Sequence, residues 1–92
     1  MVSYRLETTK DFDKQFKKLD KTAQFLILKW LKNHLKDAEN PRNTGKGLIG
    51  DKSGEWRYRI GDYRLLCNIL DDELVILALE VGHRREIYKK KN

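Results

Sequence analysis

The sequence predicts one α+β domain, in which an antiparallel β-meander packs on an N-terminal helical hairpin in the order β-α-α-β-β-β. Three observations predict this class. Residues 2–7 alternate apolar and polar side chains, two segments with apolar residues at helical spacing follow, and residues 55–81 alternate again around two tight turns. A length of 92 residues fits a single domain with one core, spanning residues 1–92.

The first half of the chain predicts a strand over residues 2–7 and two helices. Thr8 or Thr9 can cap a helix over about residues 9–19, and Asp20 can cap a second helix over about 21–37. Almost no linker separates these helices, so they are expected to form an antiparallel hairpin. Apolar residues cover much more than one face of the second helix. This predicts that the helix is either deeply buried or makes a second contact besides the core.

Residues 40–54 are expected to form a loop that contains a literal G-x-G-x-x-G at Gly45, Gly47 and Gly50. A dinucleotide site needs this motif between a strand and a helix. Here the motif follows a helix and leads into a strand, so the loop interpretation is favoured.

Three strands are predicted at about residues 55–60, 63–70 and 73–81. A two-residue turn at Gly61-Asp62 fixes the first register, with Arg59 opposite Arg64. One face of this hairpin then takes the helices. It carries Trp56, Tyr58, Ile60, Tyr63, Leu65 and Cys67, whereas the other face carries Arg57, Arg59 and Arg64.

The Arg59–Arg64 pair is a like-charge pair, which costs stability in a sheet. One interpretation is that both side chains simply extend into water. The other is that the arginines form an anion site. A second tight turn at Asp71-Asp72 would place Leu79 opposite Arg64 and return the last strand towards Gly61, with His83 and Arg84 at the rim of the arginines.

Composition adds a charge argument. The chain has 20 Lys and Arg against 14 Asp and Glu, so its net charge of +6 favours a polyanionic partner, or else only a soluble basic surface. The one cysteine, Cys67, excludes an internal disulfide and predicts a reducing compartment. No signal region, membrane span, metal-ligand cluster or cofactor motif is apparent, so a cytoplasmic, metal-independent protein is expected. Cys67, Trp30 and Trp56 are expected in the core, and His34 at the surface or capping its helix.

Two runs carry a resemblance that extends over the whole chain: residues 56–65 (WRYRIGDYRL) and residues 82–88 (GHRREIY). The sequence resembles the RelE/ParE superfamily of bacterial toxins and, more narrowly, the RelE-type messenger-RNA endonucleases of type II toxin–antitoxin systems. The resemblance implies a RelE-like fold. It also implies an enzyme that enters the ribosomal A site and cleaves mRNA by attack of a ribose 2′-OH on the adjacent phosphate, which inhibits translation.

The resemblance also implies roles for individual residues. Arg57 and Arg59 match the basic pair on the first meander strand, Arg64 matches the phosphate-binding arginine, and Arg84 and Tyr88 match the arginine and tyrosine near the C-terminus. The basic tail adds Arg85, Lys89 and Lys90 as RNA-binding residues.

One departure affects the chemistry. Well-known members carry lysines where this chain has Arg57 and Arg59, and an arginine does not act as a general base because it stays protonated. That leaves His83, Tyr88 or Glu86 to accept a proton. Histidine ordinarily titrates near neutrality, which favours His83; alternatively, His83 only positions RNA.

Partners follow from the resemblance as well. They are a cognate antitoxin protein, the ribosome and its mRNA, and DNA only through the toxin–antitoxin complex at its own operator; no membrane is involved. Two alternatives remain open. One is a ParE-like inhibitor of DNA gyrase, in which the arginine–tyrosine set is generally not kept. The other is a non-catalytic nucleic-acid-binding module.

Overall fold

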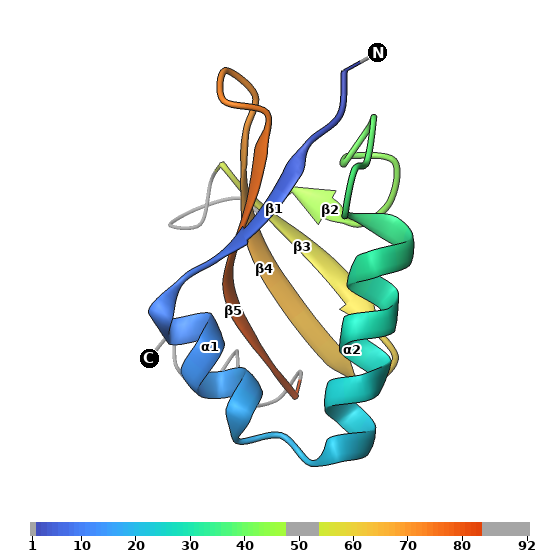
Figure 1. Cartoon of the computed structure of the whole chain (residues 1–92), viewed down its shortest axis with the longest axis vertical. Coiled ribbons are helices and arrows are strands. Elements are labelled where there is room, and N and C mark those ends of the chain that lie inside the picture. Colours follow the sequence, from blue (N-terminus) through green and yellow to red (C-terminus); the bar gives the residue numbers. More distant parts are fainter. Residues whose placement is uncertain (1, 48–53, 84–92) are drawn as a thin grey trace.

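The computed structural model describes residues 2–47 and 54–83, which form two helices and a five-stranded mixed sheet (Figure 1). The elements, in chain order, are β1 (Arg5–Thr8), α1 (Lys10–Lys17), α2 (Lys21–His34), β2 (Lys46–Gly47), β3 (Glu55–Ile60), β4 (Tyr63–Leu70) and β5 (Val75–His83). In the sheet the order is β1-β5-β4-β3-β2, with β1 parallel to β5 and every other pair antiparallel. The α+β class and the meander are confirmed; β2 lies inside the segment that was predicted to be all loop.

Both helices begin where the sequence predicts. Thr9 Oγ1 accepts a hydrogen bond from Phe12 N at 3.1 Å, and Asp20 Oδ1 accepts one from Ala23 N at 2.7 Å. Gln24 Nε2 then donates to Leu19 O at 2.9 Å, which joins the start of α2 to the segment after α1. The helices end two or three residues earlier than predicted, at Lys17 and His34.

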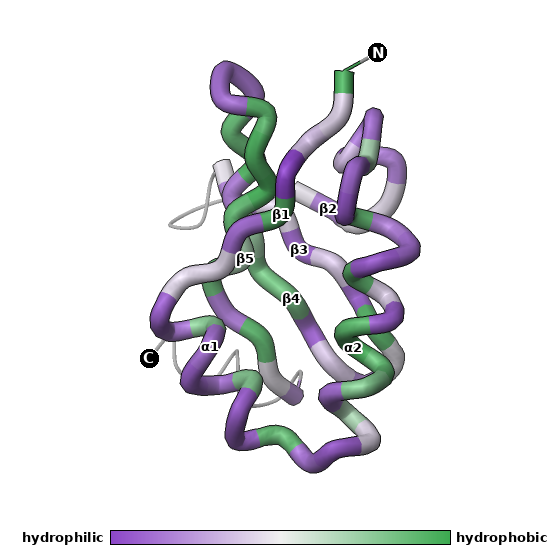
Figure 2. The backbone as a smooth tube through the Cα atoms, in the orientation of Figure 1, coloured by the Kyte–Doolittle hydropathy of each residue, from purple (hydrophilic) through white to green (hydrophobic). Residues whose placement is uncertain are grey.

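The main core lies between the two helices and one face of the sheet, and β4 and β5 form much of its hydrophobic floor (Figure 2). The helices contribute Phe12, Ile27, Leu31 and Leu35, and the strands contribute Tyr58, Ile60, Leu65, Cys67, Ile76, Ala78 and Val81. The predicted helix-facing side of the sheet is therefore confirmed. Cys67 is fully buried, and burial raises the pKa of its thiol.

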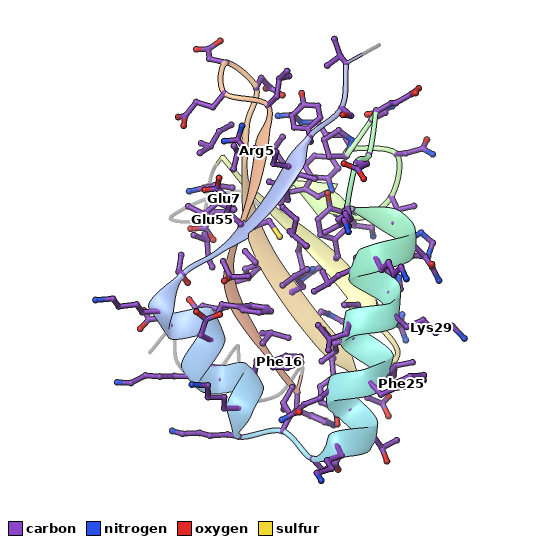
Figure 3. The ribbon with its side chains drawn as sticks, viewed as in Figure 1. Arg5, Glu7, Phe16, Phe25, Lys29 and Glu55 are labelled. Carbon is purple, nitrogen blue, oxygen red and sulfur yellow. The ribbon has the colours of Figure 1, made fainter. Side chains whose placement is uncertain are left out.

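Helix α2 is not buried on all sides. Phe25 is 69% exposed and Leu28 is 54% exposed, and Phe25 and Lys29 extend away from the sheet (Figure 3). The expectation of deep burial is therefore wrong, and a second contact for this helix stays a prediction. No helix in residues 2–47 and 54–83 is both long enough and apolar enough to span a membrane.

The two hairpins differ in how well their registers were predicted. Gly61 adopts a φ of 59°, and β3 and β4 pair with Arg59 opposite Arg64, as predicted. The register of β4 and β5 is wrong in the prediction, because residues 71–74 all belong to the turn and the pairing shifts between Leu66 and Cys67. Gly82, not Leu79, therefore lies opposite Arg64.

Candidate functional site

Cations from three adjacent strands gather on the sheet face opposite the core. Lys46 of β2 lies opposite Arg57 of β3, and Arg59 of β3 lies opposite Arg64 of β4. Arg57 and Arg59 are two residues apart, so they share a face of the strand. We call Lys46, Arg57, Arg59 and Arg64 the cationic cluster. Like charges placed directly opposite each other destabilise a sheet, so folding alone does not explain this arrangement.

Arg64 is the least exposed member of the cluster, at 8%. Its neighbours across the sheet are Arg59 and Gly82, and neither provides an acceptor side chain. The buried Nε and Nη1 atoms of its guanidinium have no hydrogen-bond partner within the described part of the chain. A buried donor left unpaired costs about 1–3 kcal/mol, and an anion is a ligand whose oxygens can accept from both atoms.

The cationic cluster lines a cavity of about 460 Å³. Helix α2 forms one wall from the core side of the sheet, the segment entering β2 forms a second at the β3 edge, and the cluster on β3 and β4 forms the third from the opposite face. The lining residues are Trp30, His34, Thr44, Gly45, Lys46, Arg57, Tyr58, Arg59 and Arg64. Three of the arginines predicted as site residues, Arg57, Arg59 and Arg64, therefore meet in one place.

The second wall depends on Gly45. This residue has a φ of +85°, and a Cβ built on it would lie 2.6 Å from both Arg57 O and Trp56 Nε1. Trp56 Nε1 also donates a hydrogen bond to Thr44 O at 2.7 Å. Glycine is thus needed here because the loop packs directly on β3. This explains the glycine without a dinucleotide; Gly50 of the same motif lies outside the described residues.

The first wall, together with Tyr58 of β3, carries a row of aromatic rings. The Trp30 ring lies 5.3 Å from the Tyr58 ring and 4.7 Å from the His34 ring, measured between centroids. The Tyr58 hydroxyl donates a hydrogen bond to Pro41 O, and burial raises the pKa of Tyr58. Tyr58 is therefore a structural member of the wall and is unsuited to exchanging protons near neutral pH.

His83 does not join the cluster as the sequence predicted. It is the last residue of β5 and lies opposite Tyr63, with the two rings edge to face at 5.9 Å. Cross-strand partners share a face, so His83 is on the side of Tyr63 and the core, not on the side of Arg64. The cause is the β4–β5 register, which differs from the predicted one. Arg84, Arg85, Tyr88, Lys89 and Lys90 lie outside the described residues.

Three residues of the cavity were not predicted as site residues. Trp30 packs against the core and His34 is exposed, as predicted, but both also line the cavity, as does Lys46 from the segment predicted to be a loop. Trp30 and His34 are four residues apart on α2, a spacing that places two side chains on one helix face, and that signal was present in the sequence. Among residues 2–47 and 54–83, no group of three or more His, Cys, Asp or Glu side chains could hold a metal ion.

Comparison with known proteins identifies the family to which this fold and cavity belong. Residues 6–88 match the family described as the ParE toxin of the type II toxin–antitoxin system parDE. The chain therefore belongs to this family of the RelE/ParE toxins.

Individual relatives carry RelE names. The chain is 32% identical over 84 residues to a RelE-like toxin protein of Escherichia coli, covering 90% of this chain and 85% of that protein. It is 36% identical over 53 residues to toxin RelG of Mycobacterium tuberculosis, covering 58% of this chain and 61% of that toxin. The alignment to RelG thus spans less than two thirds of either protein.

Solved structures show the same fold. The toxin–antitoxin complex RelBE2 from Mycobacterium tuberculosis matches with a TM-score of 0.82 and 28% identity, over 91% of this chain and 94% of that chain. The isolated RelE toxin of Escherichia coli matches with a TM-score of 0.71 and 26% identity, over 97% of this chain and 95% of that chain.

Proposed function

We propose that this toxin is a ribosome-dependent endoribonuclease that cleaves mRNA in the ribosomal A site. One observation carries the proposal. The buried guanidinium of Arg64, unpaired at Nε and Nη1 within the described residues, lines a cavity together with Arg57 and Arg59. A phosphate diester supplies the acceptor oxygens that such a guanidinium needs.

The proposed reaction is an internal transfer at phosphorus. The ribose 2′-oxygen forms a bond to the adjacent phosphorus as its proton leaves, and the bond from phosphorus to the 5′-oxygen breaks. The products are a 2′,3′-cyclic phosphate and a 5′-hydroxyl, which takes up a proton. Negative charge builds on the phosphate oxygens during this step, and fixed guanidinium groups stabilise it.

Roles for individual residues follow from this chemistry. Arg64 binds the scissile phosphate, and Arg57 and Arg59 stabilise the added charge. Arg84 and Tyr88, whose roles rest on the family resemblance, supply a further guanidinium and a ring for an RNA base. Arg85, Lys89 and Lys90 contact the RNA backbone. The charge is neutralised by arginine alone, so the proposed step uses neither a metal ion nor an organic cofactor.

The proton acceptor is not among the arginines, because a guanidinium stays protonated. The position of His83 beside Tyr63, away from the cavity, gives no support to a direct role in proton transfer. Glu86 and Tyr88 are the other candidate acceptors near the C-terminal end of the sequence, and substitution of each tests that assignment.

The proposed partners are an antitoxin, the ribosome and mRNA. The RelBE2 structure is a toxin–antitoxin complex. We propose that residues 1–92 act as a single domain in the cytoplasm. By analogy with the complex, we propose that a cognate antitoxin covers the basic surface of this domain and blocks access of RNA. DNA is reached only through that complex at its own operator. A toxin–antitoxin complex that cleaves at the full rate would contradict this blocking role.

The test is a translation extract programmed with one mRNA, in which cleavage sites are mapped by primer extension. We expect the wild-type chain to cut within codons at the A site and Arg64→Met to lose this activity. Arg42→Met is a matched control, because Arg42 is paired with Asp71 and does not line the cavity. Absence of cleavage at A-site codons by the wild-type chain would overturn the proposal.

The name of the matching family favours a second candidate, inhibition of DNA gyrase. A supercoiling assay tests it, and inhibition there without mRNA cleavage would replace the first proposal. A non-catalytic RNA-binding module is tested by the double variant Arg64→Ala with Arg84→Ala. If its expression arrests growth as strongly as wild type, cleavage is not the toxic activity.

A further inference from the structure

We propose that helix α2 supplies a base-stacking wall to the cavity, so that the site binds a nucleotide as a unit: its phosphate at the cationic cluster and its base against Trp30 and His34. This inference deepens the proposed function, on which the choice of RNA as ligand rests. It assigns a binding role to a helix that otherwise only covers the sheet.

The aromatic row has the right form for such a wall. Tyr58 is buried beneath Trp30, Trp30 is half-buried, and His34 is exposed, so the row runs from the core to the cavity and ends on an accessible ring. Every nucleic-acid base has a flat π-face that can stack on an aromatic side chain. Because Tyr58 and Trp30 hold the row from below, a base can stack there without first ordering a flexible side chain.

The distribution of charged side chains determines which end of the cavity would receive the phosphate of a nucleotide and which end its base. Lys46, Arg57, Arg59 and Arg64 line the same cavity as the aromatic pair. His34 also lines a neighbouring hollow, whose lining includes Asp37 and Glu39, and their carboxylates repel a phosphate. The phosphate is therefore drawn to the sheet and the base to α2. A volume of about 460 Å³ also falls in the range of small-molecule sites and accommodates a nucleotide.

Stacking can be separated from other roles of His34 by the choice of substitution. His34 is exposed, so its replacement leaves the core intact. His34→Ala removes the ring, whereas His34→Phe keeps a ring but removes both nitrogens. Asn33→Ala is a matched control, because Asn33 is an exposed neighbour that does not line the cationic cavity.

The experiment measures binding of a trinucleotide with 2′-O-methyl riboses, which resists 2′-OH attack, by quenching of tryptophan fluorescence in the full chain. We expect His34→Ala to weaken binding by about 5- to 100-fold, and His34→Phe and Asn33→Ala to bind like wild type. A trinucleotide with an abasic central position should bind wild type and His34→Ala equally weakly.

Three results would overturn the stacking wall: no binding of the probe by wild type, unchanged binding by His34→Ala, or a loss in His34→Phe as large as in His34→Ala. The last would mean that the nitrogens of His34 matter and not its ring. The probe is not cleaved, so this assay is independent of the proposed activity. A chain that shows the expected binding series yet cleaves no mRNA would retain the subsite and lose the endoribonuclease proposal.

Discussion

Two arginines of this small protein, Arg42 and Arg64, differ in their burial and in their hydrogen-bond partners. Arg42 Nη1 and Nη2 donate to the two carboxylate oxygens of Asp71, each at 2.9 Å, and its guanidinium lies 5.9 Å from the centroid of the Trp56 ring. Asp71 also accepts a hydrogen bond from the Tyr4 hydroxyl at 2.6 Å. Arg64 is far more buried, faces another arginine across the sheet, and leaves Nε and Nη1 unpaired among the described residues.

This difference between the two arginines distinguishes a side chain that stabilises the fold from one that we propose binds a ligand. Arg42 is about half exposed and donates to both carboxylate oxygens of Asp71, and it ties the N-terminal segment, the loop before β2 and the β4–β5 turn together. Arg64 is buried where a charge is least favourable, so the fold loses stability by holding it there. Arg42 thus has an ion-pair partner inside the fold, whereas Nε and Nη1 of Arg64 have no partner among the described residues, and this contrast is the basis of the proposal that Arg64 binds a phosphate.

The largest expected effect is on Arg64. We expect Arg64→Met to reduce mRNA cleavage by about 100- to 1,000-fold, since a fixed donor to the charged phosphate is lost. The same change removes a buried, unpaired group, so the free energy of unfolding should rise by about 1 kcal/mol or more. Cleavage by primer extension and unfolding in urea measure the two effects. An active but destabilised variant would mean that Arg64 supports the fold, like Arg42.

The loop that connects the two arginine regions gives the next largest effect. Gly45→Ala places a Cβ 2.6 Å from a backbone oxygen of β3 in addition to its strained φ, whereas Gly54→Ala at a φ of +95° meets nothing within 4 Å. We expect Gly54→Ala to lose about 1–3 kcal/mol from backbone strain alone, and Gly45→Ala to lose clearly more and to weaken RNA binding. Equal losses in urea unfolding would show that the loop does not pack on β3.

Substitution of Arg42 should have the opposite effects to substitution of Arg64, and the effects should be smaller. Arg42→Met removes a partly exposed pair with Asp71, so we expect a small loss of stability and cleavage close to wild type, because exposed ion pairs contribute little. Thermal unfolding and the primer-extension assay check this. A large loss of cleavage would place the Arg42 region in the functional site and remove the contrast with Arg64.

The hairpin around Gly61 shows how far sequence reasoning extends. A single glycine with a positive φ in a two-residue turn fixes every pair of β3 and β4, so the Arg59–Arg64 pair was predictable. The register of the β4–β5 hairpin was not predictable, because Asp71-Asp72 contains no glycine that would indicate the type of turn. The chain there uses a four-residue turn with Leu74 at a φ of 55°, and a bulge follows beside Leu66.

The same contrast applies to the site. The three arginines come from one hairpin, and local register brings them together. Trp30 and His34 come from α2 and Lys46 comes from β2, and only the tertiary packing of distant segments places them beside the arginines. Register therefore predicts the cationic wall of the cavity. The spacing of Trp30 and His34 predicts that they share a helix face, but only packing determines that this face meets the arginines.

The smallest expected effect concerns acid stability at the Arg42 region. Hydrogen bonds from Arg42 and from the Tyr4 hydroxyl hold the pKa of Asp71 at about 2, below its ordinary value of 3.8. A carboxyl group whose pKa is lowered by folding stabilises the folded state at pH values above its ordinary pKa. This contribution is lost as the pH falls through the pKa of the folded state. Urea unfolding of wild type and Asp71→Asn should therefore differ at pH 6, and the difference should shrink between about pH 4 and pH 2.

A difference that stays constant down to pH 2 would show that Asp71 acts through packing and not through its charge. The same pH series also separates the two arginines. The contribution of Arg42 depends on an ionised partner and should fade with Asp71. The gain in stability from Arg64→Met should not follow the titration of Asp71, because the residues across the sheet from Arg64 are Arg59 and Gly82.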